Sequence, residues 1–213
     1  MELFLILHIL QMEHGISGGN RFNLRSINHK EGNDVKRYIA LLRGINVSGK
    51  NKIVMTELKT GFEELDFVEV TTHLNSGNVI FSSRLEDTLL LAKNIKSMIK
   101  NKFNLELPVH VLLQEELKEI IENAPDWWGN ADKAIYDNLI FLMFPLVYEE
   151  FYDEMGSPKA DLEKIHHYKN VVFWSFSRKD YQKTNWWSKT ANSNVKNKIT
   201  IRTANTVRRI VGM

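Results

Sequence analysis

The sequence predicts an α+β fold in which one order of elements, strand–helix–strand–strand–helix–strand, occurs twice. The first observation is that each half contains two strand-like segments joined by a polar turn. The second is that NVIF (78–81) and NVVF (170–173) occupy corresponding places in the two halves. The chain has 213 residues, of which 43% are hydrophobic and 25% charged, as in ordinary globular proteins. We therefore expect two tandem subdomains with antiparallel sheets.

The first half follows this order from residue 35 onward. RYIALLR at 37–43 is a continuous apolar run typical of a buried strand, and Thr56 is a candidate N-cap for the helix after it. Residues 67–74 alternate like a half-buried strand, and the Gly/Asn turn at 75–78 returns the chain. The remaining expected elements are a strand at 78–83, a helix at 86–102 and a strand at 108–113. This order is the split βαβ, or ferredoxin-like, motif.

The second half repeats the order after a predicted linker helix at 114–123, which Ala124-Pro125 closes. Pro145 suits the first turn of a helix that runs to Met155. The other expected elements are strands at 135–144, 162–167, 171–177 and 198–202, a partly helical segment at 179–194 and a closing helix at 204–211. The predicted domains are an extension at 1–34, a ferredoxin-like subdomain at 35–113, a linker helix at 114–124, and a second ferredoxin-like subdomain with a C-terminal helix at 125–213.

The first 34 residues differ from the rest in pattern. LFLILHIL at 3–10 is an apolar run of eight residues, whereas a membrane span needs about 20. Glu2 is the only early charge, which argues against a signal peptide. We expect an extension that an upstream start codon would explain, no membrane association and a cytoplasmic location.

Composition excludes several kinds of chemistry. The chain has no cysteine, so it has no disulfide framework, thiolate zinc site or cysteine nucleophile. His166 and His167 are neighbours and would face opposite sides of a strand, and no other ligand lies at metal spacing. We expect neither a metal nor a cofactor, and no G-x-S-x-G motif is present.

GINVSGKN at 44–51 resembles a phosphate-binding P-loop. The residue that should carry a hydroxyl is Asn51, and the next helix begins several residues too late. The surrounding order of elements is also split βαβ rather than doubly wound. We therefore do not expect a P-loop NTPase.

The same loop is nevertheless rich in basic and amide side chains. In a split βαβ sheet the end of the first strand and the turn between the second and third strands lie at one edge, so loop and turn should meet. The result would be a rim suited to anions. The candidate ligand-binding residues are Arg43, Gly44, Asn46, Gly49, Lys50 and Lys52 in the loop and Asn75, Ser76, Gly77 and Asn78 in the turn. The alternative is that Gly and Asn only shape the turns while the basic side chains point into water.

The C-terminal strand–helix junction adds Arg202, Asn205 and Thr206 to the candidate ligand-binding residues. Residues 178–213 carry nine basic residues and one acidic residue, whereas residues 114–177 carry five and thirteen. The basic end favours a nucleic-acid or anion surface. Alternatively, the basic and the acidic segment face each other and partly neutralise their charges. For the C-terminal junction, the alternative is that Asn205 or Thr203 caps the last helix while the arginines point into water. Trp186-Trp187 would stack on a base; alternatively, the pair packs in a core or makes a contact between subdomains.

Three stretches resemble an uncharacterised bacterial family, domain of unknown function 1697: RYIALLRGINVSGKNKI (37–53), TTHLNSGNVIFSS (71–83) and TIRTANTVRRI (200–210). The resemblance covers about residues 35–213. Ser48 stands where the family usually has glycine, and Thr203 where it usually has asparagine. The resemblance implies tandem ferredoxin-like subdomains and no particular activity.

The leading hypothesis is an anion-binding module for nucleic acid or a nucleotide-like, phosphorylated ligand. One alternative is an enzyme acting on a small phosphorylated or carboxylate metabolite, with Arg43 and Lys50 as electrostatic clamps. The other is a structural or oligomerising protein without a small-molecule site.

Overall fold

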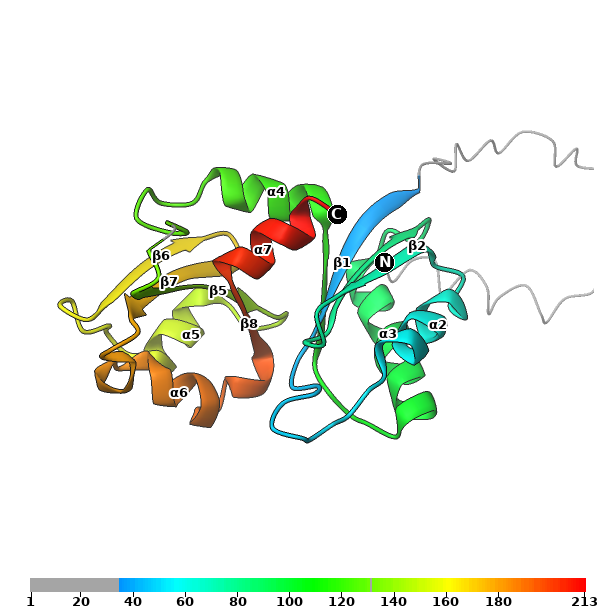
Figure 1. Cartoon of the computed structure of the whole chain (residues 1–213), viewed down its shortest axis with the longest axis horizontal. Helices are drawn as coiled ribbons and strands as arrows, with labels where there is room; N and C mark the ends of the chain where they lie inside the picture. Colours follow the sequence, from blue (N-terminus) through cyan, green and yellow to red (C-terminus); the bar gives the residue numbers. More distant parts are fainter. Residues whose placement is uncertain (1–34, 131) are drawn as a thin grey trace, which may run out of the picture. The chain divides into compact units, whose positions relative to one another are not determined.

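The computed structural model describes residues 35–130 and 132–213, so the predicted extension and its apolar run at 3–10 lie outside the described part. The fold is α+β. The described residues form two four-stranded antiparallel sheets with helices packed on them (Figure 1).

The first sheet has the strand order β2-β3-β1-β4, and every neighbouring pair is antiparallel. Two helices cover one face, where Leu58, Phe62 and Ile95 are fully buried. A stack of aromatic rings, including Phe67 on Phe81 at 4.5 Å, completes this core. The elements are β1 (Lys36–Leu42), α2 (Met55–Glu63), β2 (Val68–His73), β3 (Asn78–Ser83), α3 (Thr88–Phe103) and β4 (Val109–Leu113).

The second sheet repeats this arrangement with the order β6-β7-β5-β8, again antiparallel throughout. Its own core contains Trp174 and Trp186, whose ring centroids lie 6.2 Å apart. The elements are β5 (Ile135–Leu142), α5 (Tyr148–Met155), β6 (Glu163–Tyr168), β7 (Val171–Ser177), the short 3-10 helices η1 (Tyr181–Lys183) and η2 (Lys196–Lys198), α6 (Trp186–Asn192), β8 (Ile199–Thr203) and α7 (Ala204–Val211).

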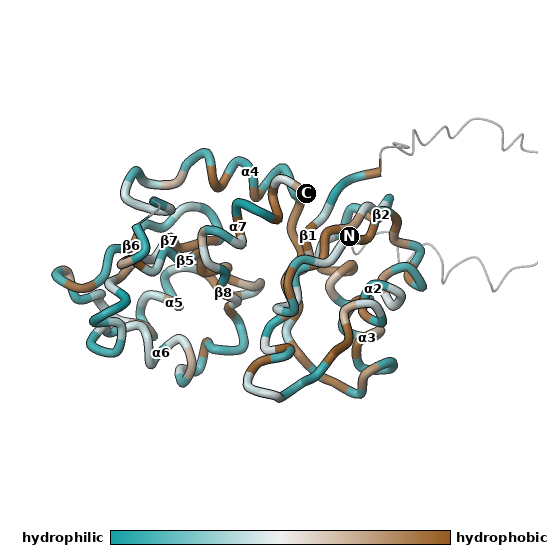
Figure 2. The backbone as a smooth tube through the Cα atoms, in the orientation of Figure 1, coloured by the Kyte–Doolittle hydropathy of each residue, from teal (hydrophilic) through white to brown (hydrophobic). Residues whose placement is uncertain are grey.

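A third hydrophobic core joins the two sheets. Ile39 and Leu41 of the first sheet belong to one buried cluster with Leu139 and Phe141 of the second. The helices α4 (Gln114–Glu122) and α7 contribute their apolar faces to it, and both helices alternate brown and teal along their length in Figure 2. The predicted linker helix is therefore a wall of a shared core.

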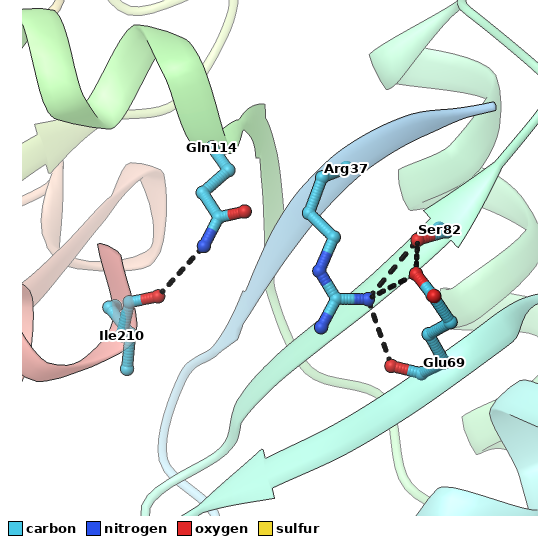
Figure 3. A network of polar contacts seen from close by, with 5 residues as sticks. All are labelled: Arg37, Glu69, Ser82, Gln114 and Ile210. Carbon is cyan, nitrogen blue, oxygen red and sulfur yellow. Dashed lines mark hydrogen bonds and ion pairs between the residues drawn. The ribbon is translucent and has the colours of Figure 1, made fainter. Parts of the chain in front are cut away.

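Polar contacts at the margin of this core fix its helices and strands (Figure 3). The Gln114 side chain at the start of α4 donates to the carbonyl oxygens of Val211, at 3.0 Å, and Ile210, at 3.4 Å. On the first sheet, Arg37 Nη1 donates to Ser82 Oγ at 3.1 Å and to the Glu69 backbone oxygen at 2.9 Å. These bonds link β1, β2 and β3 where the ladder between β2 and β3 shifts register.

The predicted N-cap at Thr56 and the predicted helix start at Pro145 are both wrong. The second helical residue of α2 is Thr56, and the cap position is Val54, without a side-chain cap bond. The α5 helix begins at Tyr148 rather than at Pro145, because residues 143–146 close a turn in which Leu146 N donates to Met143 O at 3.0 Å. Within residues 35–130 and 132–213, no helix combines the length and apolarity that crossing a membrane requires.

Candidate functional site

The loop after β1 is a tight hairpin. Asn46 N donates to Asn51 O at 3.1 Å, and Lys50 N donates to Val47 O at 2.9 Å. Ser48 and Gly49 form its tip with φ angles of 49° and 78°. A serine in this left-handed region is uncommon, so the departure from glycine at Ser48 falls where a side chain is strained.

The Asn46 side chain ties this loop to the β2–β3 turn. Its Nδ2 donates to the backbone oxygens of Asn75 and Ile53, both at 3.0 Å, and its Oδ1 accepts from Ile53 N at 2.9 Å. Nearby, Leu42 N donates to Gly77 O at 2.8 Å. The loop and the turn therefore lie side by side, as expected from the sequence.

Arg202 on β8 reaches across to the same turn. Its Nε donates to Asn78 Oδ1 at 2.5 Å, and its Nη2 donates to Leu42 O at 2.9 Å and Ser76 O at 3.2 Å. Its Nη1 donates to Thr200 Oγ1 at 2.9 Å and to the Ile201 carbonyl at 2.8 Å. The guanidinium thus fastens the second sheet to the first.

The Arg202 charge is buried without a counter-ion, because none of its hydrogen-bond partners among the described residues is a carboxylate. Burial, and secondarily the positive charge of Arg43, lowers the pKa of Arg202 to about 10. Asn78 is fully buried too, and its Nδ2 donates to His73 O and Ser76 Oγ, both at 3.0 Å. The polar groups of these two predicted ligand residues are therefore already engaged within the fold.

Arg43 makes a second link between the sheets. Its guanidinium donates to Ile199 O at 2.9 Å and to Thr190 O at 3.4 Å, and burial lowers its pKa. Of the remaining loop and turn candidates, Gly77 is buried, whereas the others are exposed: Gly44, Gly49, Lys50, Lys52, Asn75 and Ser76.

Asn205 and Thr206, the last candidate residues of the C-terminal motif, lie away from the basic loop and the turn. Asn205 lines a separate cavity with Tyr136 and Arg178, and no lining residue of that cavity belongs to the basic loop or the turn. Thr206 N donates to Thr203 Oγ1 at 3.4 Å, so the Thr203 side chain caps α7, as one of the two alternatives predicts. The structure thus joins Arg202 to the loop and turn, but does not bring Asn205 or Thr206 to them.

Comparison with known proteins identifies the family. Residues 35–173 match the family described as "Protein of unknown function (DUF1697)". The chain belongs to this family.

A solved structure supports the fold. A conserved bacterial protein from Streptococcus pneumoniae shares 29% sequence identity with this chain, and the two structures superpose with a TM-score of 0.73. The match covers 84% of this chain and 98% of that one. A comparison with curated proteins gives no match.

This DUF1697 member also contains a cavity that no sequence motif indicated. Its volume is about 460 Å³. Its walls come from α3, β4, α4, the end of β5 with residues 143–147 after it, the β6–β7 turn and η2. His110, Phe141 and Leu142 lie among apolar neighbours in it, and the lysines Lys93, Lys96 and Lys198 also line it. These residues are scattered between positions 88 and 198, so no local pattern could have revealed the cavity.

Proposed function

We propose that the chain is a tandem of two ferredoxin-like units that binds phosphate-containing anions through its basic loop. The strand orders β2-β3-β1-β4 and β6-β7-β5-β8, with one helix after the first and one after the third strand of each unit, support the ferredoxin-like assignment. The observation that carries the function is a fixed loop that presents two unpaired lysines.

Hydrogen bonds from two asparagine side chains to backbone oxygens fix the loop. Asn51 Nδ2 donates to Gly44 O at 2.9 Å, and Asn46 anchors the loop to the turn. By contrast, the ammonium groups of Lys50 and Lys52 have no hydrogen-bond or ion-pair partner among residues 35–130 and 132–213, and both side chains are exposed. Charges on a rigid, open loop favour the approach of anions at low entropic cost.

The surface beside the lysines favours a ligand that lies along it. Apart from the adjoining residues of the chain, no atom comes within 4 Å of the positions that a Cβ would take on Gly44 and Gly49, so a ligand backbone can approach closely. A few exposed lysines bind a single phosphate weakly, whereas a polymer contacts several of them together. A short single-stranded oligonucleotide is therefore the favoured class of ligand.

Arg43 separates this proposal from the enzyme alternative. A clamp for a small metabolite would need a free guanidinium, but Arg43 donates to two backbone oxygens of the second sheet. This geometry favours a binding module over an enzyme built on Arg43 and Lys50. The oligomerising alternative predicts a mass above that of the monomer in light scattering, with no response to nucleic acid.

The test is fluorescence anisotropy of a labelled single-stranded oligonucleotide at several salt concentrations. We expect tight binding at low salt, and in the double variant Lys50→Gln with Lys52→Gln a slope of log Kd against log salt that is smaller by about 1.4. The matched control, Lys118→Gln with Lys164→Gln, removes two exposed lysines that lie on α4 and β6 and should keep the wild-type slope. Absence of binding, or equal losses in both double variants, would refute the proposal.

A further inference from the structure

The strand registers show which residues of one half of the fold correspond to those around the cavity in the other half. In the first sheet Leu41 pairs with Asn78 and with His110; in the second, Phe141 pairs with Val171 and with Thr200. The bonds that follow also correspond, because Leu42 N donates to Gly77 O and Leu142 N to Asn170 O, both at 2.8 Å. The two halves therefore align residue by residue at these strand ends. The register sets Asn78 against Val171, so the sequence match of NVIF (78–81) with NVVF (170–173) is displaced by one residue from the structural alignment.

This alignment pairs Leu112 with Arg202, since Leu112 lies opposite Ile39 and Arg202 opposite Leu139. It also pairs Met143 with Arg43, because Arg43 N donates to Pro108 O at 3.0 Å and Met143 N to Lys198 O at 2.9 Å. In one half, Arg43 and Arg202 span the space between the sheets. At the corresponding place in the other half stand an uncharged leucine and a methionine.

The consequence is an open space where the other half is filled. Leu112, Met143, Asn170 and Val171, which correspond to Arg202, Arg43, Gly77 and Asn78, all line the cavity of about 460 Å³. That volume lies in the range of small-molecule sites. The cavity thus lies where Leu112 and Met143 stand in place of the two arginines of the other half.

The lining suits a molecule with one apolar and one anionic end. Leu112, Phe141 and Leu142 are nearly fully buried and supply apolar walls. Three lysines, Lys93, Lys96 and Lys198, also line the cavity and are exposed, against the one carboxylate of Glu116.

These lysines are free to bind. Within the part of the chain that the structure describes, none of the three ammonium groups has a hydrogen-bond or ion-pair partner. A cation is disfavoured because Val171 replaces Asn78, whose side-chain oxygen accepts from Arg202 in the other half.

His110 supplies a polar group inside the cavity. Its ring centroid lies 5.7 Å from that of Phe141, and its imidazole makes no hydrogen bond to any described residue. Burial, and secondarily the charge of Arg202, lowers its pKa to about 4, so the ring is neutral at pH 7. A neutral imidazole offers one N–H donor and one acceptor nitrogen.

We infer that this cavity binds a small organic anion, with its apolar body between Leu112 and Phe141 and its carboxylate or phosphate group toward the three lysines. This inference does not depend on nucleic-acid binding by the basic loop, which involves different residues.

The test uses 1-naphthoate and 1-naphthyl phosphate as anionic probes and 1-naphthalenemethanol as the neutral probe of the same body. Calorimetry should show binding of at least one anion and about tenfold weaker binding of the alcohol. The two anions distinguish a carboxylate site from a phosphate site. In NMR spectra the imidazole signals of His110 should shift on titration, while those of His73 and His166 stay in place.

The triple variant Lys93→Gln, Lys96→Gln, Lys198→Gln should weaken binding of the anion about tenfold and leave the alcohol unaffected. The control, Lys118→Gln with Lys164→Gln, should bind the anion like the wild type. Loss of the anion in Lys50→Gln with Lys52→Gln instead would place the binding on the basic loop and overturn this inference. Binding of the alcohol as tight as that of the anions would overturn the inference, as would unchanged binding in the triple variant or a stationary His110 signal.

Discussion

At the scale of single residues, the junction between the sheets depends on a buried charge satisfied only by neutral oxygens. Arg202 is 9% exposed and donates to oxygens from three segments: the end of β1, the β2–β3 turn and β8 itself. Such a group stabilises one specific arrangement, because any displacement would leave a charge and several carbonyl oxygens unpaired.

Replacement of this arginine should therefore be costly. We expect Arg202→Met to lower the free energy of unfolding by about 3 kcal/mol, since methionine fills similar space but leaves buried carbonyl oxygens without donors. Arg209 on α7 is exposed, so Arg209→Met, the same change, should stay within about 0.5 kcal/mol of the wild type. Urea unfolding measures both, and similar losses would contradict the structural role of Arg202.

Gly77 is required by both its backbone angle and its surroundings. Its φ is 75°, and an added Cβ would lie 2.7 Å from Leu42 Cβ and 2.9 Å from Leu42 O. Gly49 has a φ of 78° but open space around it. In thermal unfolding, Gly77→Ala should therefore cost clearly more than Gly49→Ala, for which about 1–2 kcal/mol of backbone strain is expected. Equal losses of stability in the two variants would show that Leu42 moves aside without cost.

His110 gives stability a specific pH dependence. Its folded pKa of about 4 lies below the usual 6.5, so between these values the unfolded chain binds a proton that the folded chain does not. This contribution to stability is therefore complete above pH 6.5 and is lost as the pH falls toward 4. From pH 7 to pH 5, His110 should account for about 2 kcal/mol of lost stability. The decrease should be smaller by that amount in His110→Leu, and an identical decrease would contradict the assignment.

At the scale of elements, apolar periodicity located most strands and helices, whereas helix ends depended on particular side-chain contacts. The α3 helix begins at Thr88, two residues later than expected, because Asp87 caps it. The Asp87 carboxylate accepts from Leu89 N at 2.9 Å and from Leu90 N at 3.0 Å. No such cap forms at Thr56, although threonine is a favourable cap residue. The helix already begins one residue earlier, at Met55, so Thr56 lies within its first turn.

The Asp87 cap makes a measurable prediction. Asp87→Ala should lower the free energy of unfolding by about 1 kcal/mol, because two backbone N–H groups lose their acceptor. Asp153 is exposed within α5, so Asp153→Ala should cause no loss, since alanine is the better helix former. Chemical denaturation of the two variants compares them directly; an equal effect would mean that the cap contributes nothing.

At the scale of the whole described chain, the two sheets share a core and should unfold together. Trp128 packs edge-on against Phe173 at 5.0 Å within the cluster that also contains Ile39 and Ile80 of the first sheet. A subdomain cut at residue 113 would expose those side chains. The boundaries at 113 and 124 therefore stay predictions about sequence organisation, and we expect a single folding unit.

The distribution of tryptophan provides the test. All five tryptophans follow residue 124, so their fluorescence reports only the second half, whereas far-ultraviolet circular dichroism reports both sheets. One cooperative unit requires the two urea transitions to coincide. Distinct midpoints would instead show two subdomains that unfold separately.

The sequence by itself determined the order of elements, because apolar periodicity and Gly/Asn turns depend only on neighbouring residues. It also placed the loop of Lys50 beside the turn of Asn75, since the predicted split βαβ order puts both at the same edge of the sheet. Only the tertiary structure decided which charged groups remain free. Arg43 and Arg202 look like ligand contacts in the sequence, but contacts with the opposite sheet engage them, and the cavity of His110 arises where the equivalent positions carry Met143 and Leu112. The contacts of Arg43 with Ile199 and of Arg202 with Leu42 join residues 156 and 160 positions apart. The sequence does not show them, because the packing of whole sheets decides which groups are buried.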